Sequence, residues 1–135
     1  MIKITEDILN PETVVNEVRN TAAGCVISYV GLIRDNSHDK SVVSVEYTDP
    51  AGKAVDGLKS IVEEVRKSFP IIDMAFHHRI GLLKPGDINI VIAIASGHRG
   101  EAFDACRRAV DLFKEKLPTN KVETYTDGTT LNAAD

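Results

Sequence analysis

The stretch "INIVIAIASGHRGEAF", residues 88–103, decides the fold class of this chain. Its middle part, Val91 to Ala95, is apolar at every position, so a strand there would be buried on both faces. A Gly, a His and an Arg follow, and an amphipathic pattern then begins. The sequence therefore predicts a strand that is central in its sheet or lies at a subunit interface, followed directly by a helix.

That helix is expected over residues 100–117, and Pro118 would end it because proline cannot continue a helix. The apolar positions that recur at helical spacing are Phe103, Cys106, Val110, Phe113 and Leu117. We expect these five side chains to be buried. Ser96 is a candidate cap for the start of the helix.

Turn and cap signals place the elements before the central strand. Two apolar runs within residues 71–95 flank Pro85-Gly86, which predicts a β-hairpin. An amphipathic helix is expected to start at Asp49-Pro50 and to end at Phe69-Pro70. A shorter helix is expected after Asn10, its predicted N-cap.

The remaining segments read as strands. Residues 1–5, 23–34 and 41–48 are β-rich, and residues 121–126 favour a last short strand. Residues 122–135 are expected to form a short or frayed C-terminal tail. The strands come in pairs between helices, so we predict one α+β domain over residues 1–135, with a mixed or antiparallel sheet and packed helices.

Composition limits the class of protein. The chain has 135 residues, 43% of them hydrophobic, and a formal net charge of −4 without a stripe of Lys or Arg. Nucleic acid and membrane are therefore not expected partners. Cys25 and Cys106 lie in apolar patterns without metal-ligand spacing, and the acidic N-terminal segment does not read as a signal peptide. A reducing, cytoplasmic location is expected.

His98 and Arg99 lie where a helix N-terminus attracts anions. One interpretation is that they bind a phosphate or a carboxylate. The other is that His98 is solvated and Arg99 pairs with Glu101 or Asp104. The spacing of the residues leaves both open.

The other polar residues give weaker signals. Lys114 and Lys121 flank the Pro118 break, where chain reversal would bring both amines to one cleft, but most lysines near a helix C-terminus are solvated. Arg34 ends a β-rich run, as surface residues often do. His77 and His78 are adjacent, so on a strand they point to opposite faces and cannot chelate one metal ion. No metal site is predicted.

Four segments together resemble the catalytic, large subunit of molybdopterin synthase, and the resemblance runs from about Gly24 to Glu123. They are "GLIRDN", "HHRIGLLKPGD", "VIAIASGHRGEAFDACRRAVDLFKEKLP" and "KVE". The resemblance implies an α/β-hammerhead fold and a homodimer within a heterotetramer. It also implies a small ubiquitin-like sulfur-carrier subunit that ends in a Gly-Gly thiocarboxylate. The reaction implied is sulfur transfer to cyclic pyranopterin monophosphate, which makes molybdopterin without a cofactor.

The resemblance also assigns residues. Its substrate-pocket His-Arg pair falls on His98 and Arg99, and Arg34 and Glu123 match further positions that bind substrate. Its two catalytic lysines fall on Lys114 and Lys121. On this basis Arg34, His98 and Arg99 are expected to hold the phosphate. The lysines are expected to act as proton donors, proton acceptors or a transient covalent partner.

The chain departs from the family pattern at several positions. Asn120 replaces an aromatic residue, Val122 replaces a basic one, Pro50 replaces a Tyr, and the C-terminal segment is short. These departures support an alternative, in which a non-catalytic relative binds the carrier protein or a phosphate-bearing ligand without turnover. A third interpretation is a sensor for a small anion or a nucleotide.

Overall fold

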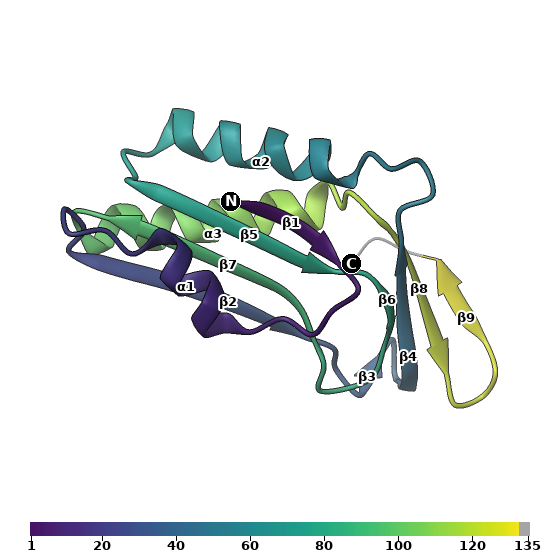
Figure 1. Ribbon diagram of the computed structural model, residues 1–135. Coiled ribbons are helices and arrows are strands. Elements are labelled where there is room, and N and C mark those ends of the chain that lie inside the picture. Colours follow the sequence, from purple (N-terminus) through teal and green to yellow (C-terminus); the bar gives the residue numbers. More distant parts are fainter. Residues whose placement is uncertain (133–135) are drawn as a thin grey trace.

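The protein is described by a computed structural model that covers residues 1–132 (Figure 1). The helices are α1 (Pro11–Val18), α2 (Ala54–Ser68) and α3 (Arg99–Glu115). The strands are β1 (Ile2–Thr5), β2 (Cys25–Leu32), β3 (Asn36–Ser37), β4 (Lys40–Thr48), β5 (Asp73–Arg79), β6 (Gly81–Leu83), β7 (Ile88–Ser96), β8 (Asn120–Tyr125) and β9 (Thr130–Asn132). The predicted α+β class is confirmed.

Strand β7 is an inner strand of the first sheet, whose order is β1-β5-β7-β2. It pairs antiparallel with β5 on one side and with β2 on the other, whereas β1 pairs parallel with β5. Residues 90–96 of β7 are buried. The expectation of a central strand, drawn from residues 88–103, is therefore confirmed.

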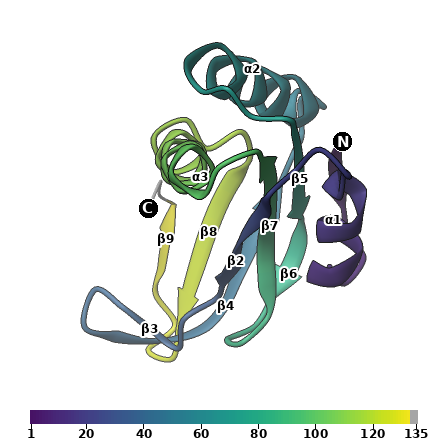
Figure 2. The same ribbon diagram turned by 90° about the vertical axis from the view of Figure 1, so that its left-hand side faces the viewer.

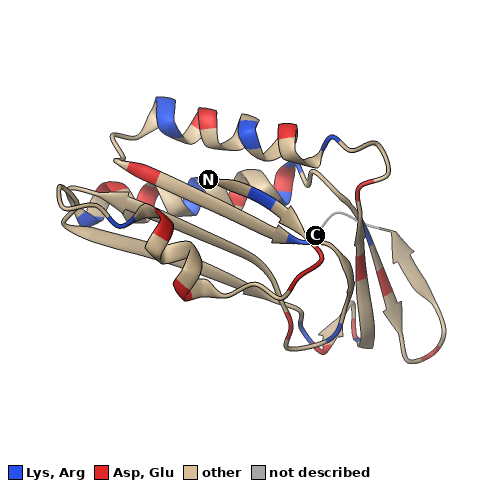
Figure 3. Cartoon of the chain, viewed as in Figure 1, with Lys and Arg blue, Asp and Glu red and all other residues tan. Residues whose placement is uncertain are grey.

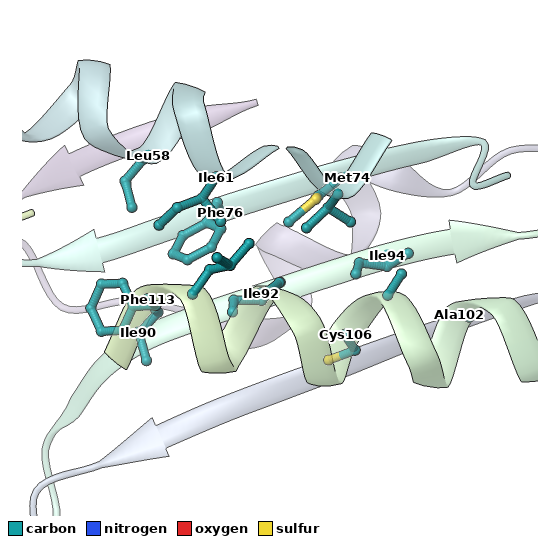
Figure 4. Close-up of a cluster of buried hydrophobic side chains, with 14 residues drawn as sticks. Leu58, Ile61, Met74, Phe76, Ile90, Ile92, Ile94, Ala102, Cys106 and Phe113 are labelled. Carbon is teal, nitrogen blue, oxygen red and sulfur yellow. The ribbon is translucent and has the colours of Figure 1, made fainter. Parts of the chain in front are cut away.

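Helices cover both faces of this sheet (Figure 2). Ile90, Ile92 and Ile94 pack with α2 and α3, and Figure 4 shows this cluster with Phe76 between the sheet and the helices. The alternate residues of β7, from Val91 to Ala95, face α1 on the opposite side. Because successive strand side chains point to opposite faces, a strand covered on both sides must be apolar throughout.

The second sheet has the order β3-β4-β8-β9, with β6 also paired to β4. This pairing corrects the predicted hairpin. Pro85-Gly86 does form the tight turn, with Gly86 at φ 92° and the Asp87 N–H bonded to the Lys84 carbonyl. However, β6 leaves the first sheet and its Leu83 enters the small core of the second, so β7 pairs with β5 instead.

Two details of α3 differ from the prediction. Ser96 is the last residue of β7 and does not cap α3, because the N-cap position falls on His98, which makes no side-chain cap. Phe103 is 56% exposed, whereas the alanines at 102, 105 and 109 face the sheet together with Cys106 and Phe113. These small alanine side chains let α3 lie close to β7 and β2. The face of α3 that contacts the sheet is therefore centred on the alanines, and Phe103 lies outside it.

The start of α2 is later than predicted, whereas that of α1 is as expected. The Asn10 side chain accepts a hydrogen bond from the Glu12 N–H and caps α1, which confirms its predicted role. Asp49 does not start α2 directly. Its carboxylate instead accepts hydrogen bonds from the N–H groups of Lys53 and Ala54, four and five residues further on.

The last short strand predicted over residues 121–126 is confirmed as β8, whereas the expected frayed tail over residues 122–135 is wrong for residues 122–132. These residues belong to the β8–β9 hairpin, in which Glu123 pairs with Leu131 and Thr124 with Thr130. The side chains of Tyr125 and Leu131 pack in the core of the second sheet. This burial holds the hairpin in place, although most residues of the segment are polar. Residues 133–135 lie outside the part of the chain that the structure describes.

Most charged residues lie on the outside of the fold. In Figure 3, Lys, Arg, Asp and Glu colour the helices, the loops and parts of β1, β4, β5 and β8, whereas β2 and β7 carry none. Among residues 1–132, no helix combines the length and the apolar character that crossing a bilayer requires.

Candidate active site

A pocket of about 610 Å³ opens where the two sheets meet the C-terminal half of α3. Its wall comes from the end of β2, from β3 and β4, from the start of β7, and from β8. Four charged residues line it: Arg34, Lys114, Lys121 and Glu123. The structure thus brings together four of the six residues that the resemblance assigns.

The fold explains why residues so distant in sequence converge. Lys114 lies in the last turn of α3, one residue after the buried Phe113. The chain reverses direction around Pro118 and continues as β8. In the register of the sheet, Lys121 of β8 lies opposite Tyr47 of β4. Chain reversal at the proline therefore places both lysines in the wall of one pocket.

Lys121 and Glu123 form an ion pair inside this wall. The Lys121 Nζ lies 3.5 Å from the Glu123 Oε1, and the two side chains are only 9% and 12% exposed. The Tyr125 hydroxyl donates to the Glu123 Oε2 at 2.6 Å. Burial alone would raise the pKa of Glu123, but hydrogen bonds from Tyr125 and Ser37 and the charge of Lys121 together bring this pKa below its usual value.

His78 supports the pocket from behind. Its Nδ1 lies 2.9 Å from the Asn89 carbonyl oxygen, to which it donates, and its Nε2 accepts from the Thr119 hydroxyl at 2.9 Å. Its ring meets Tyr47 and Phe113 edge-on. Burial lowers the pKa of His78 to about 4, so the imidazole is neutral at physiological pH. His77 points to the other face and bonds Glu17 of α1, as the alternation of strand side chains predicts.

The rim of the pocket contains a turn in an unusual conformation. His38 and Asp39 join β3 to β4, and both have positive φ, 52° and 61°, although neither is glycine. This pair of left-handed residues gives the tight reversal that the hairpin needs. The turn places His38 among the residues that line the pocket, near Arg34.

His98 and Arg99 lie far from this pocket. Both are exposed at the start of α3, about 22 Å along the helix axis from Lys114. Neither Glu101 nor Asp104 forms an ion pair with Arg99 within residues 1–132, and Glu101 instead accepts a hydrogen bond from Ser96. One copy of the chain therefore does not bring this pair to the pocket.

A second hollow of about 670 Å³ adjoins the first, and Lys121 lines both. Asn120 and Val122, two of the departures from the family pattern, line this second hollow. Within residues 1–132, no group of three or more His, Cys, Asp or Glu is arranged to hold a metal ion.

Sequence reasoning missed Tyr125, Ser37 and His38. A signal for Tyr125 was available, because positions 121, 123 and 125 of a strand share one face. A Lys, a Glu and a Tyr at alternate positions are thus neighbours by geometry. Ser37 and His38 gave no comparable signal, because their directions depend on the two-residue strand β3 and on the turn that joins it to β4.

Comparisons with known proteins agree on one family. Residues 4–116 match the family model described as MoaE protein. The molybdopterin synthase catalytic subunit of Thermoplasma volcanium is 33% identical over 127 residues, which cover 94% of this chain and 93% of that protein. The human protein of the same name is 31% identical over 130 residues, 96% of this chain and 69% of that protein. The crystal structure of molybdopterin synthase from Staphylococcus aureus superposes with a TM-score of 0.89 at 27% identity, over 98% of this chain and 96% of that one.

Proposed function

The chain belongs to the MoaE family, and from this premise we propose that it is the catalytic subunit of a molybdopterin synthase. In this proposal a small ubiquitin-like carrier subunit delivers sulfur as a C-terminal Gly-Gly thiocarboxylate. The acceptor is cyclic pyranopterin monophosphate, and the product is molybdopterin.

The observation that carries the proposal is the convergence of Lys114, Lys121, Arg34 and Glu123 on one pocket. Three cations and one carboxylate give the wall a positive charge in a chain whose net charge is −4. A phosphate-bearing substrate and an anionic thiocarboxylate both suit such a wall. The apolar residues that line the same pocket, among them Ile90 and Phe113, suit the rings of a pterin.

The proposed roles follow from the chemistry of each side chain. The thiocarboxylate sulfur forms a bond to a pterin side-chain carbon while a carbon–oxygen bond of that carbon breaks, and the departing oxygen takes up a proton. Water then cleaves the bond between that sulfur and the carrier's carbonyl carbon. The carrier leaves as a carboxylate, so each cycle adds one sulfur. Lys114 and Lys121 exchange protons with the reacting groups or form a transient covalent bond, and Arg34 stabilises negative charge.

His98 and Arg99 join this scheme only if a second copy of the chain supplies them. Because α3 separates them from Lys114 within one copy, we propose that two copies form a homodimer, in which the start of α3 of one copy completes the pocket of the other. A two-fold dimer would then contain two equivalent composite sites. With one carrier on each copy, the assembly is a heterotetramer.

The test mixes the protein with a thiocarboxylated carrier and the cyclic precursor, and measures the dithiolene product. The expected result is product from the wild-type chain and none from Lys114→Ala. Lys67→Ala, which removes an exposed lysine on α2, is the control and should retain full activity. If the wild-type chain gives no product where a known synthase does, the proposed activity is wrong.

The composite site has its own test. Lys114→Ala and Arg99→Ala are each expected to be inactive alone. After the two variants are mixed and allowed to exchange subunits, about a quarter of the wild-type activity should return, because half of the dimers are mixed and each mixed dimer holds one intact site. If no activity returns although mixed dimers have formed, Arg99 does not serve the partner's pocket.

The non-catalytic alternative rests on Asn120 and Val122, which line the second hollow beside Lys121. Carrier binding without product is the result that would favour it. Phosphate protection of the native state without carrier binding would favour the anion sensor instead.

A further inference from the structure

The hydroxyl group of Tyr125 contacts the wall of the pocket from behind. Its ring belongs to the small core of the second sheet, and the residue is 4% exposed. Its hydroxyl donates to the Glu123 Oε2 at 2.6 Å, the short distance typical of a hydrogen bond to a charged carboxylate. Tyr125 does not itself line the pocket, but its hydroxyl bonds two residues that do, Glu123 and Ser37.

Glu123 is held by Tyr125, by Lys121 and by a hydrogen bond from Ser37. One carboxylate oxygen accepts from Tyr125, and the other faces the Lys121 ammonium at 3.5 Å. All three residues lie on the same side of β8, and β4 fixes their register, with Tyr47 opposite Lys121 and Val45 opposite Glu123. The arrangement is a chain of three polar groups that leads from a core phenol to a lysine in the pocket wall.

We propose that Tyr125 is a positioning residue, whose hydroxyl fixes the Glu123 carboxylate in the orientation that holds Lys121 as an ammonium ion facing the pocket. The kinetic consequence of this inference rests on the proposed function. In that reaction Lys121 supplies positive charge or a proton.

The electrostatics of the wall support this arrangement. Burial is the largest influence on the pKa of Glu123 and would raise it, but Tyr125, Ser37 and Lys121 together lower it. The same bond raises the pKa of Tyr125, because its proton is held by the carboxylate. The other charged or titratable groups that line the pocket are Arg34, His38, Lys114, Lys121, Tyr29 and Tyr47. Lys40 lies over the Tyr125 ring at 5.3 Å.

The decisive variant is Tyr125→Phe, which removes the hydroxyl and keeps the ring. We expect kcat to fall about tenfold, the effect of losing one hydrogen bond to a charged group, with little change in KM. The loss of the bond raises the pKa of Glu123, so the acidic limb of the kcat–pH profile should move to higher pH. Asp127→Asn is the control, because Asp127 belongs to the same hairpin but pairs with Lys40 at the surface. It should change neither kcat nor the profile.

A double-mutant cycle separates positioning from simple structural support. In a Glu123→Gln background the hydroxyl has no carboxylate to orient, so Tyr125→Phe should have almost no further effect on kcat. An equal loss of activity in both backgrounds would show that Tyr125 only stabilises the sheet and would overturn the proposal. So would an unchanged kcat in Tyr125→Phe when the wild-type chain is active.

NMR distinguishes this inference from the proposed function, because it needs no turnover. The Glu123 carboxyl carbon, followed by ¹³C NMR, should titrate at a higher pH in Tyr125→Phe than in the wild-type chain. An inactive wild-type chain that shows this shift would refute the activity and keep the contact between Tyr125 and Glu123. An identical titration in both proteins would refute the inference whatever the activity.

Discussion

His78 joins three elements behind the pocket, and its chemistry suits a structural role. It lies on β5, bonds the backbone of β7 through Asn89 and accepts from Thr119 just before β8. The burial of the ring disfavours the charged imidazolium, which would lose its hydration, so the folded chain holds His78 in the neutral form. Stability should therefore depend on pH through this one buried residue.

We expect the free energy of unfolding to fall as the pH drops from about 6.5 towards 4. The pKa of His78 is about 4 in the folded chain and near 6.5 when unfolded, so the unfolded chain binds the proton first. The full effect is roughly 3 kcal/mol. Urea unfolding at several pH values should show a flatter dependence for His78→Gln, whereas His38→Gln, at an exposed histidine, should behave like the wild-type chain. Equal slopes in all three proteins would contradict this role.

Arg99 provides a second prediction at the scale of single residues. If it holds the substrate phosphate, Arg99→Ala should weaken binding of the cyclic precursor by about 1.5–3 kcal/mol, because a hydrogen bond between charged groups is lost. Arg107→Ala removes an exposed arginine from the same helix and should leave the affinity unchanged. Calorimetric titration of the precursor measures both. Equal affinities for the two variants would remove Arg99 from the site.

At the scale of elements, local patterns predicted the helices and the central strand, but not which sheet each strand joins. The turn at Pro85-Gly86 was predictable because its signal is local. The departure of β6 to the second sheet depends on the burial of Leu83 beside Val45 and Tyr47, which are about forty residues away in sequence. The same reasoning applies to Phe103, because spacing defines an apolar stripe but tertiary packing decides which side of it faces the sheet.

The candidate site, too, depends on tertiary pairing that local sequence patterns do not predict. Chain reversal at Pro118 already suggested that Lys114 and Lys121 share a cleft, but the residue pattern favoured ordinary solvated lysines, and the resemblance then assigned them a catalytic role. Their convergence requires both the Pro118 break and the pairing of β8 with β4, and no local pattern reveals this pairing. Tyr125 lies in the last strand that was predicted over residues 121–126, but its partner strand β9 was expected to be part of a frayed tail, so the bond to Glu123 was missed together with the hairpin.

The hairpin itself provides a prediction. Gly128 has φ 85° in the β8–β9 turn, and an added Cβ would meet nothing within 4 Å. Gly128→Ala should therefore destabilise the protein by about 1–2 kcal/mol through backbone strain alone. Gly100→Ala, in the first turn of α3 and also with open space around it, should be neutral or stabilising by up to about 1 kcal/mol. Thermal unfolding of both variants measures the difference, and an equal effect would mean that the turn is not held in this conformation.

For the whole molecule, the contrast in charge between pocket and surface matters most. The net charge is −4, yet Arg34, Lys114 and Lys121 face one pocket against the single carboxylate of Glu123. An anionic substrate is thus repelled by the average surface and attracted by the site. Salt ions weaken both the repulsion by the surface and the attraction by the pocket. The affinity for substrate depends mainly on the attraction, because the substrate binds in the pocket.

Raising the salt concentration from 50 to 500 mM should therefore raise the KM for the cyclic precursor several-fold, with a much smaller change in kcat. Steady-state kinetics at constant pH would measure this. Arg34→Gln should weaken the dependence on salt, because one of the attracting charges is gone. A KM that does not respond to salt would mean that binding relies on contacts other than charge.

Strand β7 has a further consequence. Its residues 90–96 are buried between α1 on one side and α2 with α3 on the other, so its amide protons can exchange with solvent only when the whole fold opens. These amides should be the slowest to exchange in the protein. A compound that binds only the folded chain would slow them further, by a factor set by its concentration and dissociation constant. Deuterium uptake at this strand would then measure the affinity of precursor or carrier for any variant, including those that cannot turn over.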